Sequence, residues 1–192
     1  MSKRLFETIR IVDGKAMHLA YHQLRLERSI GASSLQLKDI LFPPQSGLLR
    51  CRVVYDKNSY DVSYHNYVKR SVCTLKLIDT DGLDYSKKYV DRSDLEALFA
   101  KKGSADDILI VQKGLIQDTT IANVAFFYKN EWLTPKNSLL LGTTRARLLD
   151  EKRLKEVEIS IDDLKTFEAV ALMNAMIDFD IIRNKKVEDV IC

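Results

Sequence analysis

Polar side chains interrupt an apolar stretch at residues 115–127, and this interruption constrains the fold of the chain more than any other feature. The stretch predicts two short strands, 115–119 and 124–128, joined by a turn. Asp118 stands at the end of the first strand and Asn123 just before the second. A carboxylate among apolar neighbours needs a partner to offset its desolvation, so we expect Asp118 to be paired. A plain aspartate at a strand end is the simpler alternative.

A second polar motif follows 19 residues after Asn123, where Gly142 and two hydroxyl residues, Thr143 and Thr144, open an apolar helical pattern over residues 143–154. The first amides of a helix lack acceptors, and together with the helix dipole they bind phosphate-sized anions. An ordinary helix N-cap would explain Thr143 equally well.

A third motif lies upstream, where Lys88 stands four residues before Arg92. A lysine, a paired acid and a phosphate cup are the three things that a protein must supply to hold pyridoxal phosphate, which is bound through a lysine amine. The neighbouring Lys87 lacks this spacing. Two adjacent lysines in a solvated loop are the alternative interpretation.

The three motifs occur in this order behind Phe-Glu-Thr-Ile-Arg at residues 6–10 and His-Gln-Leu-Arg-Leu at residues 22–26. The ordered set resembles the class IV aminotransferase family, which includes branched-chain and D-amino-acid aminotransferases and aminodeoxychorismate lyase. The resemblance runs from about Leu5 to Leu149. It implies a pyridoxal phosphate enzyme of fold type IV, and such enzymes usually form homodimers.

The resemblance also assigns roles to individual residues. Lys88 would carry the cofactor and act as the acid–base catalyst, and Asp118 would pair with the ring nitrogen, where most relatives have glutamate. Arg10 and Arg92 are candidate ligands of a substrate carboxylate, whereas Arg50 and Arg52 suit a solvent-facing strand equally well. The other candidate cofactor-binding residues are Arg25, Thr119, Thr120, Asn123, Gly142, Thr143 and Thr144.

An α+β fold with two domains is predicted, of the D-amino-acid aminotransferase type. We expect an N-terminal α+β domain at residues 1–80, a polar linker at 79–84, and a C-terminal α/β domain at 84–192 that binds pyridoxal phosphate and contains a barrel-like sheet. Arg25 and Thr143 fall in different halves, so the cofactor is expected at the domain interface.

Periodicity and turn signals predict the elements of both halves. In the first half, Asp13-Gly14 predicts a hairpin between strands 5–12 and 15–19, and Gly31 closes a helix at 21–30. The remaining predicted strands are 48–55, 60–68, 72–78, 108–112 and 157–161, and the remaining predicted helices are 93–101 and 164–172.

Composition narrows the function classes. The chain has 192 residues, 46% of them hydrophobic, and a net charge of +3. We find no basic block with interleaved aromatic residues, which argues against nucleic acid as a partner. Cys51, Cys73 and Cys192 show no close metal-ligand spacing, so no metal is expected. No signal peptide and no membrane-spanning run of about 20 apolar residues is visible, which predicts a soluble, cytoplasmic protein.

Within the family we favour the lyase that converts 4-amino-4-deoxychorismate to 4-aminobenzoate and pyruvate for folate synthesis. The alternative is an aminotransferase of the branched-chain or D-amino-acid type, which passes an amino group to a 2-oxo acid. A second alternative is an inactive relative that acts as a binding protein. Typical members carry a loop before the Phe-Glu-Thr motif that shapes the substrate pocket. Without it, we expect a pocket that is more open or that a partner subunit closes.

Overall fold

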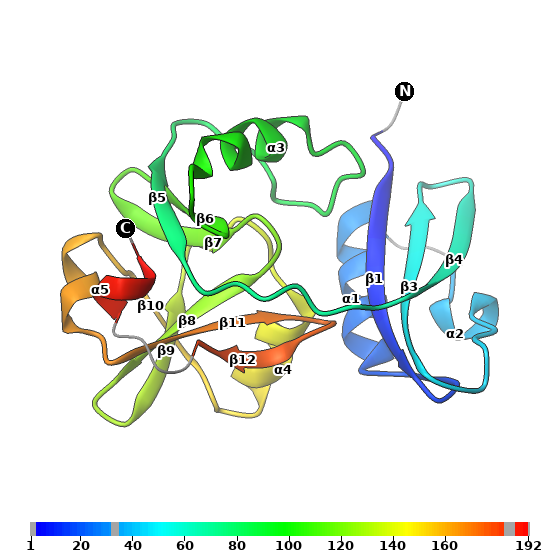
Figure 1. Cartoon of the computed structure of the whole chain (residues 1–192). Helices are drawn as coiled ribbons and strands as arrows, with labels where there is room; N and C mark the ends of the chain where they lie inside the picture. Colours follow the sequence, from blue (N-terminus) through cyan, green and yellow to red (C-terminus); the bar gives the residue numbers. More distant parts are fainter. Residues whose placement is uncertain (1–2, 32–34, 183–186, 192) are drawn as a thin grey trace. The chain divides into compact units, whose positions relative to one another are not determined.

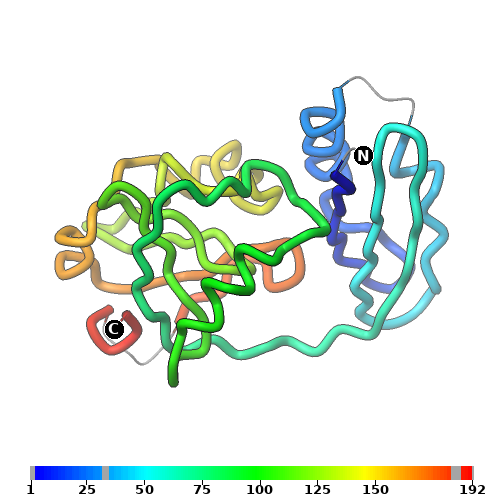
Figure 2. Tube along the Cα trace, turned by 90° about the horizontal axis from the view of Figure 1, so that it is seen from above, coloured from blue at the N-terminus to red at the C-terminus, as the bar shows by residue number. Residues whose placement is uncertain are grey.

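The computed structural model describes residues 3–31, 35–182 and 187–191. The chain divides into two units, each with its own core (Figure 1). Unit 1 consists of Met1–Lys69 and Lys87–Asp91, and unit 2 of Arg70–Ser86 and Arg92–Cys192. The chain therefore leaves unit 1, returns to it for five residues and leaves again, as the trace in Figure 2 shows. None of the described helices is long and apolar enough to cross a membrane.

Unit 1 is built on a four-stranded antiparallel sheet in the order β2-β1-β3-β4. Its strands are β1 (Leu5–Val12), β2 (Lys15–Ala16), β3 (Leu48–Tyr55) and β4 (Tyr60–Asn66). Alternate residues of β1 and β3 turn one face of the sheet toward helices α1 (Leu19–Ile30) and α2 (Leu37–Ile40), and this pattern creates the core of unit 1. The fully buried core residues include Ile9, Ile11, Leu26, Leu37, Cys51 and Val53.

The predicted hairpin is confirmed, because Asp13 and Gly14 both have positive φ and join β1 to β2. The second strand is shorter than expected and ends at Ala16. His18 adopts the left-handed conformation, which redirects the chain so that α1 begins at Leu19. The helix ends where predicted, at Gly31, whose N–H bonds the carbonyl of Glu27.

The five residues that return to unit 1 lie beside β1. Leu5 forms an isolated antiparallel bridge with Tyr89, and the amide of Phe6 donates to the carbonyl of Lys88 over 2.9 Å. The amide of Val90 donates to the carbonyl of Arg4 over the same distance. Backbone pairing with β1 thus fixes the position from which the Lys88 side chain extends.

Unit 2 contains two sheets. The strands β5 (Leu75–Asp79), β6 (Asp107–Gln112) and β7 (Leu115–Thr119) form one sheet in sequential order. The other has the order β10-β9-β8-β11-β12. Its members are β8 (Asn123–Tyr128), β9 (Glu131–Pro135), β10 (Lys155–Val157), β11 (Ala169–Asn174) and β12 (Asp178–Ile181).

Short helices connect these strands. Helix α3 (Ser93–Phe99) and the 3-10 turn η1 (Ala100–Lys102) lie in the connection between the parallel strands β5 and β6. Helix α4 (Thr143–Asp150) makes the crossover between β9 and β10, which are also parallel. The 3-10 turn η2 (Asp162–Thr166) precedes β11, and α5 (Val187–Val190) lies near the end of the chain.

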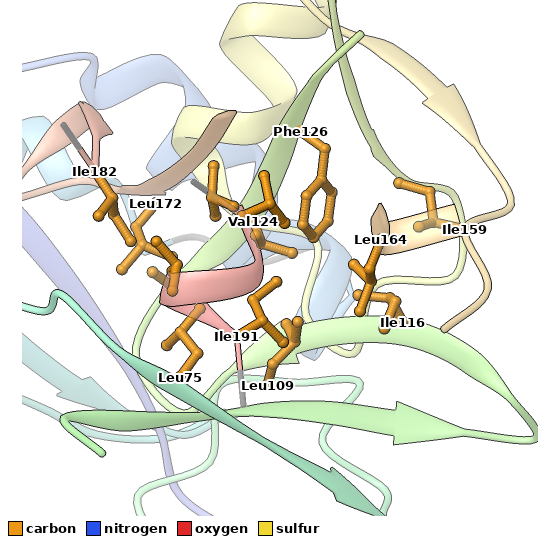
Figure 3. Close-up of a cluster of buried hydrophobic side chains, with 14 of the residues drawn as sticks. Leu75, Leu109, Ile116, Val124, Phe126, Ile159, Leu164, Leu172, Ile182 and Ile191 are labelled. Atoms are coloured by element: carbon orange, nitrogen blue, oxygen red, sulfur yellow. The ribbon is translucent and has the colours of Figure 1, made fainter. Parts of the chain in front are cut away.

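Apolar faces of both sheets of unit 2 share one core (Figure 3). Leu109 and Ile116 come from the three-stranded sheet, and Val124, Phe126 and Leu172 come from the five-stranded sheet. The predicted barrel-like sheet is therefore two sheets packed on a common core. This arrangement brings the end of β7 and the start of β8 into one short turn.

The predicted helix at 164–172 is wrong. The structure forms η2 there, followed by strand β11 between β8 and β12. Val170 and Leu172 pack into the shared core, while Met173 packs with Leu148 of α4 on the other side. A strand buried on both faces has a continuous apolar run, which periodicity cannot distinguish from a buried helix. The segment expected as a strand at 157–161 pairs instead at Lys155–Val157.

The division of the chain also differs from the predicted boundary at 79–84. Strand β5 was expected in the first half, but it pairs with β6 and belongs to unit 2. Residues 87–91 were expected in the second half, but they belong to unit 1. The physical reason in both cases is backbone pairing with a strand that is distant in sequence.

Candidate functional site

The carboxylate of Asp118 is buried at the end of β7 and is held by neutral donors. Its Oδ1 accepts a hydrogen bond of 2.8 Å from Asn123 Nδ2, and its Oδ2 accepts one of 3.0 Å from the Leu140 amide. Burial raises the pKa of Asp118 to about 6, against the opposing effect of these hydrogen bonds and of the Arg145 charge. Among the described residues no cation lies within 4 Å of this carboxylate.

Gly142 approaches the same amide side chain closely. A Cβ atom at this position would lie 1.9 Å from Asn123 Oδ1, so only glycine fits. Asn123 Nδ2 also donates to the carbonyl of Leu140 over 2.8 Å. Asn123 thus connects the Asp118 turn to the residues that lead into α4, and unit 2 brings Asp118, Asn123 and Gly142 together.

The N-terminus of α4 has no side-chain cap. Gly142 is the N-cap residue, with extended backbone, so the interpretation of Thr143 as an N-cap is wrong. Thr143 and Thr144 are the first two residues of the helix and both are buried. Their amides and that of Arg145 have no acceptor within the helix, which leaves a set of donors suited to an anion. Arg145 itself is anchored by Pro135 and Glu156.

The hydroxyls of Thr119 and Thr120 are engaged inside the turn. Thr119 Oγ1 donates to the carbonyl of Ala122 over 3.0 Å and accepts the Ala122 amide. Thr120 Oγ1 donates to the carboxylate of Asp107 over 2.8 Å. Both hydroxyl protons are therefore used to hold the turn, and the expectation that they donate to a phosphate has no support in this geometry.

In unit 1 the buried carboxylate of Glu7 organises a separate cluster. His22 Nδ1 lies 2.6 Å from Glu7 Oε2, and Arg25 donates from Nε and Nη2 to the two carboxylate oxygens over 2.8 and 2.5 Å. His22 and Arg25 lie on one face of α1, where both contact Glu7. The bidentate contact with Glu7 fixes the plane of the Arg25 guanidinium.

The charges in this cluster determine its protonation. Burial opposes ionisation of Glu7, but the Arg25 charge and the hydrogen bonds from His22 and Arg25 lower its pKa to about 2. Burial lowers the pKa of His22, and the nearby charges of Arg25 and Lys88 act in the same direction, against Glu7. Glu7 is therefore ionised and His22 neutral at pH 7, and His22 donates its Nδ1 proton to Glu7.

The two lysines of unit 1 differ in their surroundings. Lys87 Nζ donates to the carbonyl of Ser29 over 2.6 Å, near the C-terminus of α1, which is a structural contact. Lys88 is half-buried, and its Nζ lies 4.6 Å from the centre of the Phe6 ring. The structure thus gives Lys87 a helix-capping contact, and the catalytic role of Lys88 stays a prediction.

The two arginines predicted to bind substrate are placed in different units. Arg10 lies on β1 opposite Arg50 of β3, on the face of the sheet that does not carry Glu7. Arg92 Nη2 donates to the carbonyl of Thr120 over 2.7 Å, and its guanidinium lies 5.7 Å from the ring of Tyr85. Arg92 is thus part of the polar turn of unit 2.

Sequence reasoning missed three polar residues of these clusters, namely Glu7, His22 and Asp107. Glu7 alternates with Leu5, Ile9 and Ile11 on the buried face of β1, and an acid at such a position needs a cationic partner. That signal was present in the sequence. Asp107 begins an apolar strand and carries no comparable signal.

The model of the amino-transferase class IV family matches residues 56–184 of this mixed helix and strand fold. The chain belongs to this family. An uncharacterised protein of Haemophilus influenzae is 35% identical over 182 residues, which cover 90% of this chain and 97% of the relative.

Solved structures agree with this assignment. A protein of Haemophilus somnus, provisionally named a 4-amino-4-deoxychorismate lyase, is 36% identical, with a TM-score of 0.85 over 92% of this chain and 97% of the other. A hypothetical aminotransferase of Mycobacterium tuberculosis, solved with pyridoxal phosphate bound, shares the fold with a TM-score of 0.75 at 18% identity, over 95% of this chain and 81% of the other.

Proposed function

We propose that the chain is a pyridoxal-phosphate-dependent lyase that converts 4-amino-4-deoxychorismate to 4-aminobenzoate and pyruvate. The observation that carries the proposal is the buried Asp118 carboxylate, which has donors on both oxygens and no cation within 4 Å among the described residues. A cation such as a protonated ring nitrogen would stabilise this carboxylate. The name of the 36% identical Haemophilus somnus protein supports the choice of substrate.

The residues present fit the cofactor in unit 2. The uncapped amides of Thr143 and Thr144 suit its phosphate, and Gly142 allows Asn123 to hold Asp118 close to that helix N-terminus. We propose Arg25, which Glu7 holds in place, as a further phosphate ligand, as the family resemblance implies. When bound, pyridoxal phosphate supplies an electron sink for the carbon that carries the substrate amine.

Lys88 is the residue that we propose for proton transfer. Its Nζ would hold the cofactor, take the proton from the carbon that carries the substrate amine, and return it as the product forms. The Lys88 side chain is half-buried, and its Nζ lies over the ring of Phe6. Arg10 is proposed as the ligand of a substrate carboxylate.

Assembly as a homodimer and a cofactor at the interface between domains remain predictions from the family resemblance. Sedimentation of the protein with and without pyridoxal phosphate would test the first. An inactive relative that serves as a binding protein remains the alternative if no cofactor is taken up.

The first experiment uses the absorbance of the protein with added pyridoxal phosphate, before and after borohydride, with peptide mass analysis. The wild type should turn yellow, and borohydride should attach the cofactor to the peptide that contains Lys88. Lys88→Ala should abolish this attachment. Lys87→Ala is the matched control, because it removes an adjacent lysine that caps α1. Attachment that persists in Lys88→Ala would refute the assignment.

The second experiment decides between lyase and aminotransferase. The holoenzyme is incubated with 4-amino-4-deoxychorismate, and 4-aminobenzoate is measured by fluorescence and pyruvate by a coupled dehydrogenase. We expect the two products in equal amounts. Transfer of an amino group from branched-chain or D-amino acids to 2-oxoglutarate, without lyase turnover, would replace the proposed reaction with the aminotransferase alternative.

A further inference from the structure

Thr120 is held from two sides in the turn between β7 and β8. Its hydroxyl donates to both carboxylate oxygens of Asp107, over 2.8 and 3.0 Å, and its amide lies 3.4 Å from Asp107 Oδ1. Its carbonyl accepts a hydrogen bond of 2.7 Å from Arg92 Nη2. Side chain, amide and carbonyl of one residue are therefore all engaged by two charged partners.

The burial of Asp107 is costly, which indicates a specific role. The side chain is fully buried at the first position of β6, a strand that is otherwise apolar up to Val111. Its Oδ1 also accepts the amide of Ile108 over 2.8 Å. Arg70 Nη2 lies 3.9 Å from its Oδ2. An apolar residue at this position would stabilise the core of unit 2 more than a carboxylate does.

The turn that Asp107 holds contains the residues of the proposed cofactor site. Asp118 and Asn123 flank the turn and bond each other across it. Thr119 closes the turn on Ala122, and Asn174 Nδ2 donates to the carbonyl of Ile121 over 3.1 Å. Because the turn is only a few residues long, a displacement of Thr120 would displace the carboxylate of Asp118 as well.

We propose that Asp107 is a positioning residue, which acts through Thr120 to hold the Asp118 carboxylate where it can pair with the ring nitrogen of pyridoxal phosphate. This inference rests on the proposed function. Arg92, which donates to the carbonyl of the same threonine, belongs to the same hydrogen-bond network. Pre-organisation of this kind keeps a charged group in place before the ligand arrives.

The test compares Asp107→Asn with Asp106→Asn. Asp106 is the adjacent acid and accepts three hydrogen bonds, which come from Cys73 and Thr74 instead of the turn. The Kd for pyridoxal phosphate is measured by titration of the full-length apoprotein, well below its unfolding temperature. We expect Asp107→Asn to weaken binding about tenfold or more and Asp106→Asn to change it less than about twofold.

A second pair of variants keeps the test valid if Asp107→Asn folds poorly. Thr120→Val removes the hydroxyl that contacts Asp107 and preserves side-chain shape. Thr134→Val is the matched control, because this buried hydroxyl donates to the carbonyl of Val124 over 2.8 Å and does not contact the turn. Of these two variants, only Thr120→Val should weaken the binding of pyridoxal phosphate. Combined with Asp107→Asn, it should cause little further loss, because both act through one contact.

A structural measurement separates the loss of order in the turn from the loss of cofactor binding. Amide hydrogen exchange of the apoprotein at Ala122 and Asn123 should accelerate in Asp107→Asn but not in Asp106→Asn. Unchanged cofactor affinity in Asp107→Asn and Thr120→Val would overturn the inference while leaving the proposed function intact. If the wild type takes up no pyridoxal phosphate, the proposed function fails, and the inference fails with it.

Discussion

The pKa values of two buried carboxylates in this chain shift in opposite directions, because the two have different partners. Glu7 is paired with a guanidinium and a histidine, which lower its pKa to about 2. Asp118 receives hydrogen bonds from an amide side chain and a backbone amide, and burial raises its pKa to about 6. Burial alone therefore does not decide the charge of an acid. The type of partner decides it. Partners that are distant in sequence are difficult to identify from a single sequence.

Glu7 should make the protein sensitive to acid. Its folded pKa of about 2 lies below its ordinary value of 4.5, so its contribution to stability is full above pH 4.5 and is lost as the pH falls toward 2. The loss should be on the order of 3 kcal/mol. His22, whose pKa is lowered from 6.5, adds an earlier loss that begins near that pH. Urea unfolding from pH 7 to pH 2 measures both.

The variant Glu7→Gln should lack the loss below pH 4.5 and should be less stable by about 3 kcal/mol at pH 7, because Arg25 then remains buried without its counter-charge. Asp61→Asn is the control, since Asp61 forms an exposed ion pair with Arg4 and should have little effect. A wild-type unfolding free energy that stays constant between pH 4.5 and pH 2.5 would contradict the assignment.

Asp118→Asn should stabilise the apoprotein and impair cofactor binding. The folded state keeps the Asp118 proton up to about pH 6, whereas the unfolded chain loses it near 3.8, so ionisation costs stability as the pH rises through this window. Asparagine removes that cost but loses one acceptor, which leaves a gain of about 1 kcal/mol at pH 8. At pH 4 the gain should disappear. Equal effects at both pH values would argue against a desolvated carboxylate.

Gly142→Ala should destabilise unit 2 by about 1–3 kcal/mol, because the new methyl group would overlap Asn123 Oδ1. The Asn123 side chain would move and release Asp118. The double variant with Asn123→Ala tests this cause, since without the amide the methyl group has room. A double-mutant cycle of unfolding free energies should therefore show strong coupling, and additive effects would rule out the overlap.

At the scale of elements, turn residues and hydrophobic alternation predicted those helices and strands whose bounds depend on local sequence. The strand at Leu5–Val12, the helix end at Gly31 and the strand at Leu115–Thr119 have the predicted bounds, because turns and alternation specify them. The strand Ala169–Asn174 was predicted as a helix, because its identity comes from pairing with β8 and β12. The turn that follows Asp118 was predicted, but the contacts of Asp107 with Thr120 were not, because Asp107 lies on another strand.

The hairpin between β6 and β7 offers a stabilising substitution. Lys113 and Gly114 both have positive φ, which suits asparagine far better than lysine at the first position. Lys113→Asn should raise the unfolding free energy by about 0.5 kcal/mol. Lys113→Gln is the control, because it removes the same charge without the turn preference. If both variants behave alike, charge is the cause and not the turn.

At the scale of the whole molecule, the sequence predicted two parts and the structure has two units, but their boundaries differ. Composition marked residues 79–84 as a linker, whereas the chain crosses between units three times, at Lys69, Ser86 and Asp91. The crossings follow backbone pairing of β5 with β6 and of the Lys88 segment with β1. None of the three crossings lies within residues 79–84, so the polar composition of that segment did not mark them.

The two separate cores predict two cooperative unfolding units in the apoprotein. Ile9 lies in the core of unit 1 and Leu109 in that of unit 2, and both are fully buried. Ile9→Ala and Leu109→Ala should each cost about 2–5 kcal/mol, each lowering one calorimetric transition and leaving the other near its wild-type temperature. A single transition that both variants lower equally would instead mean that the units unfold together. Because the Lys88 segment pairs with β1, Ile9→Ala should also speed amide exchange at Val90, while Leu109→Ala should not.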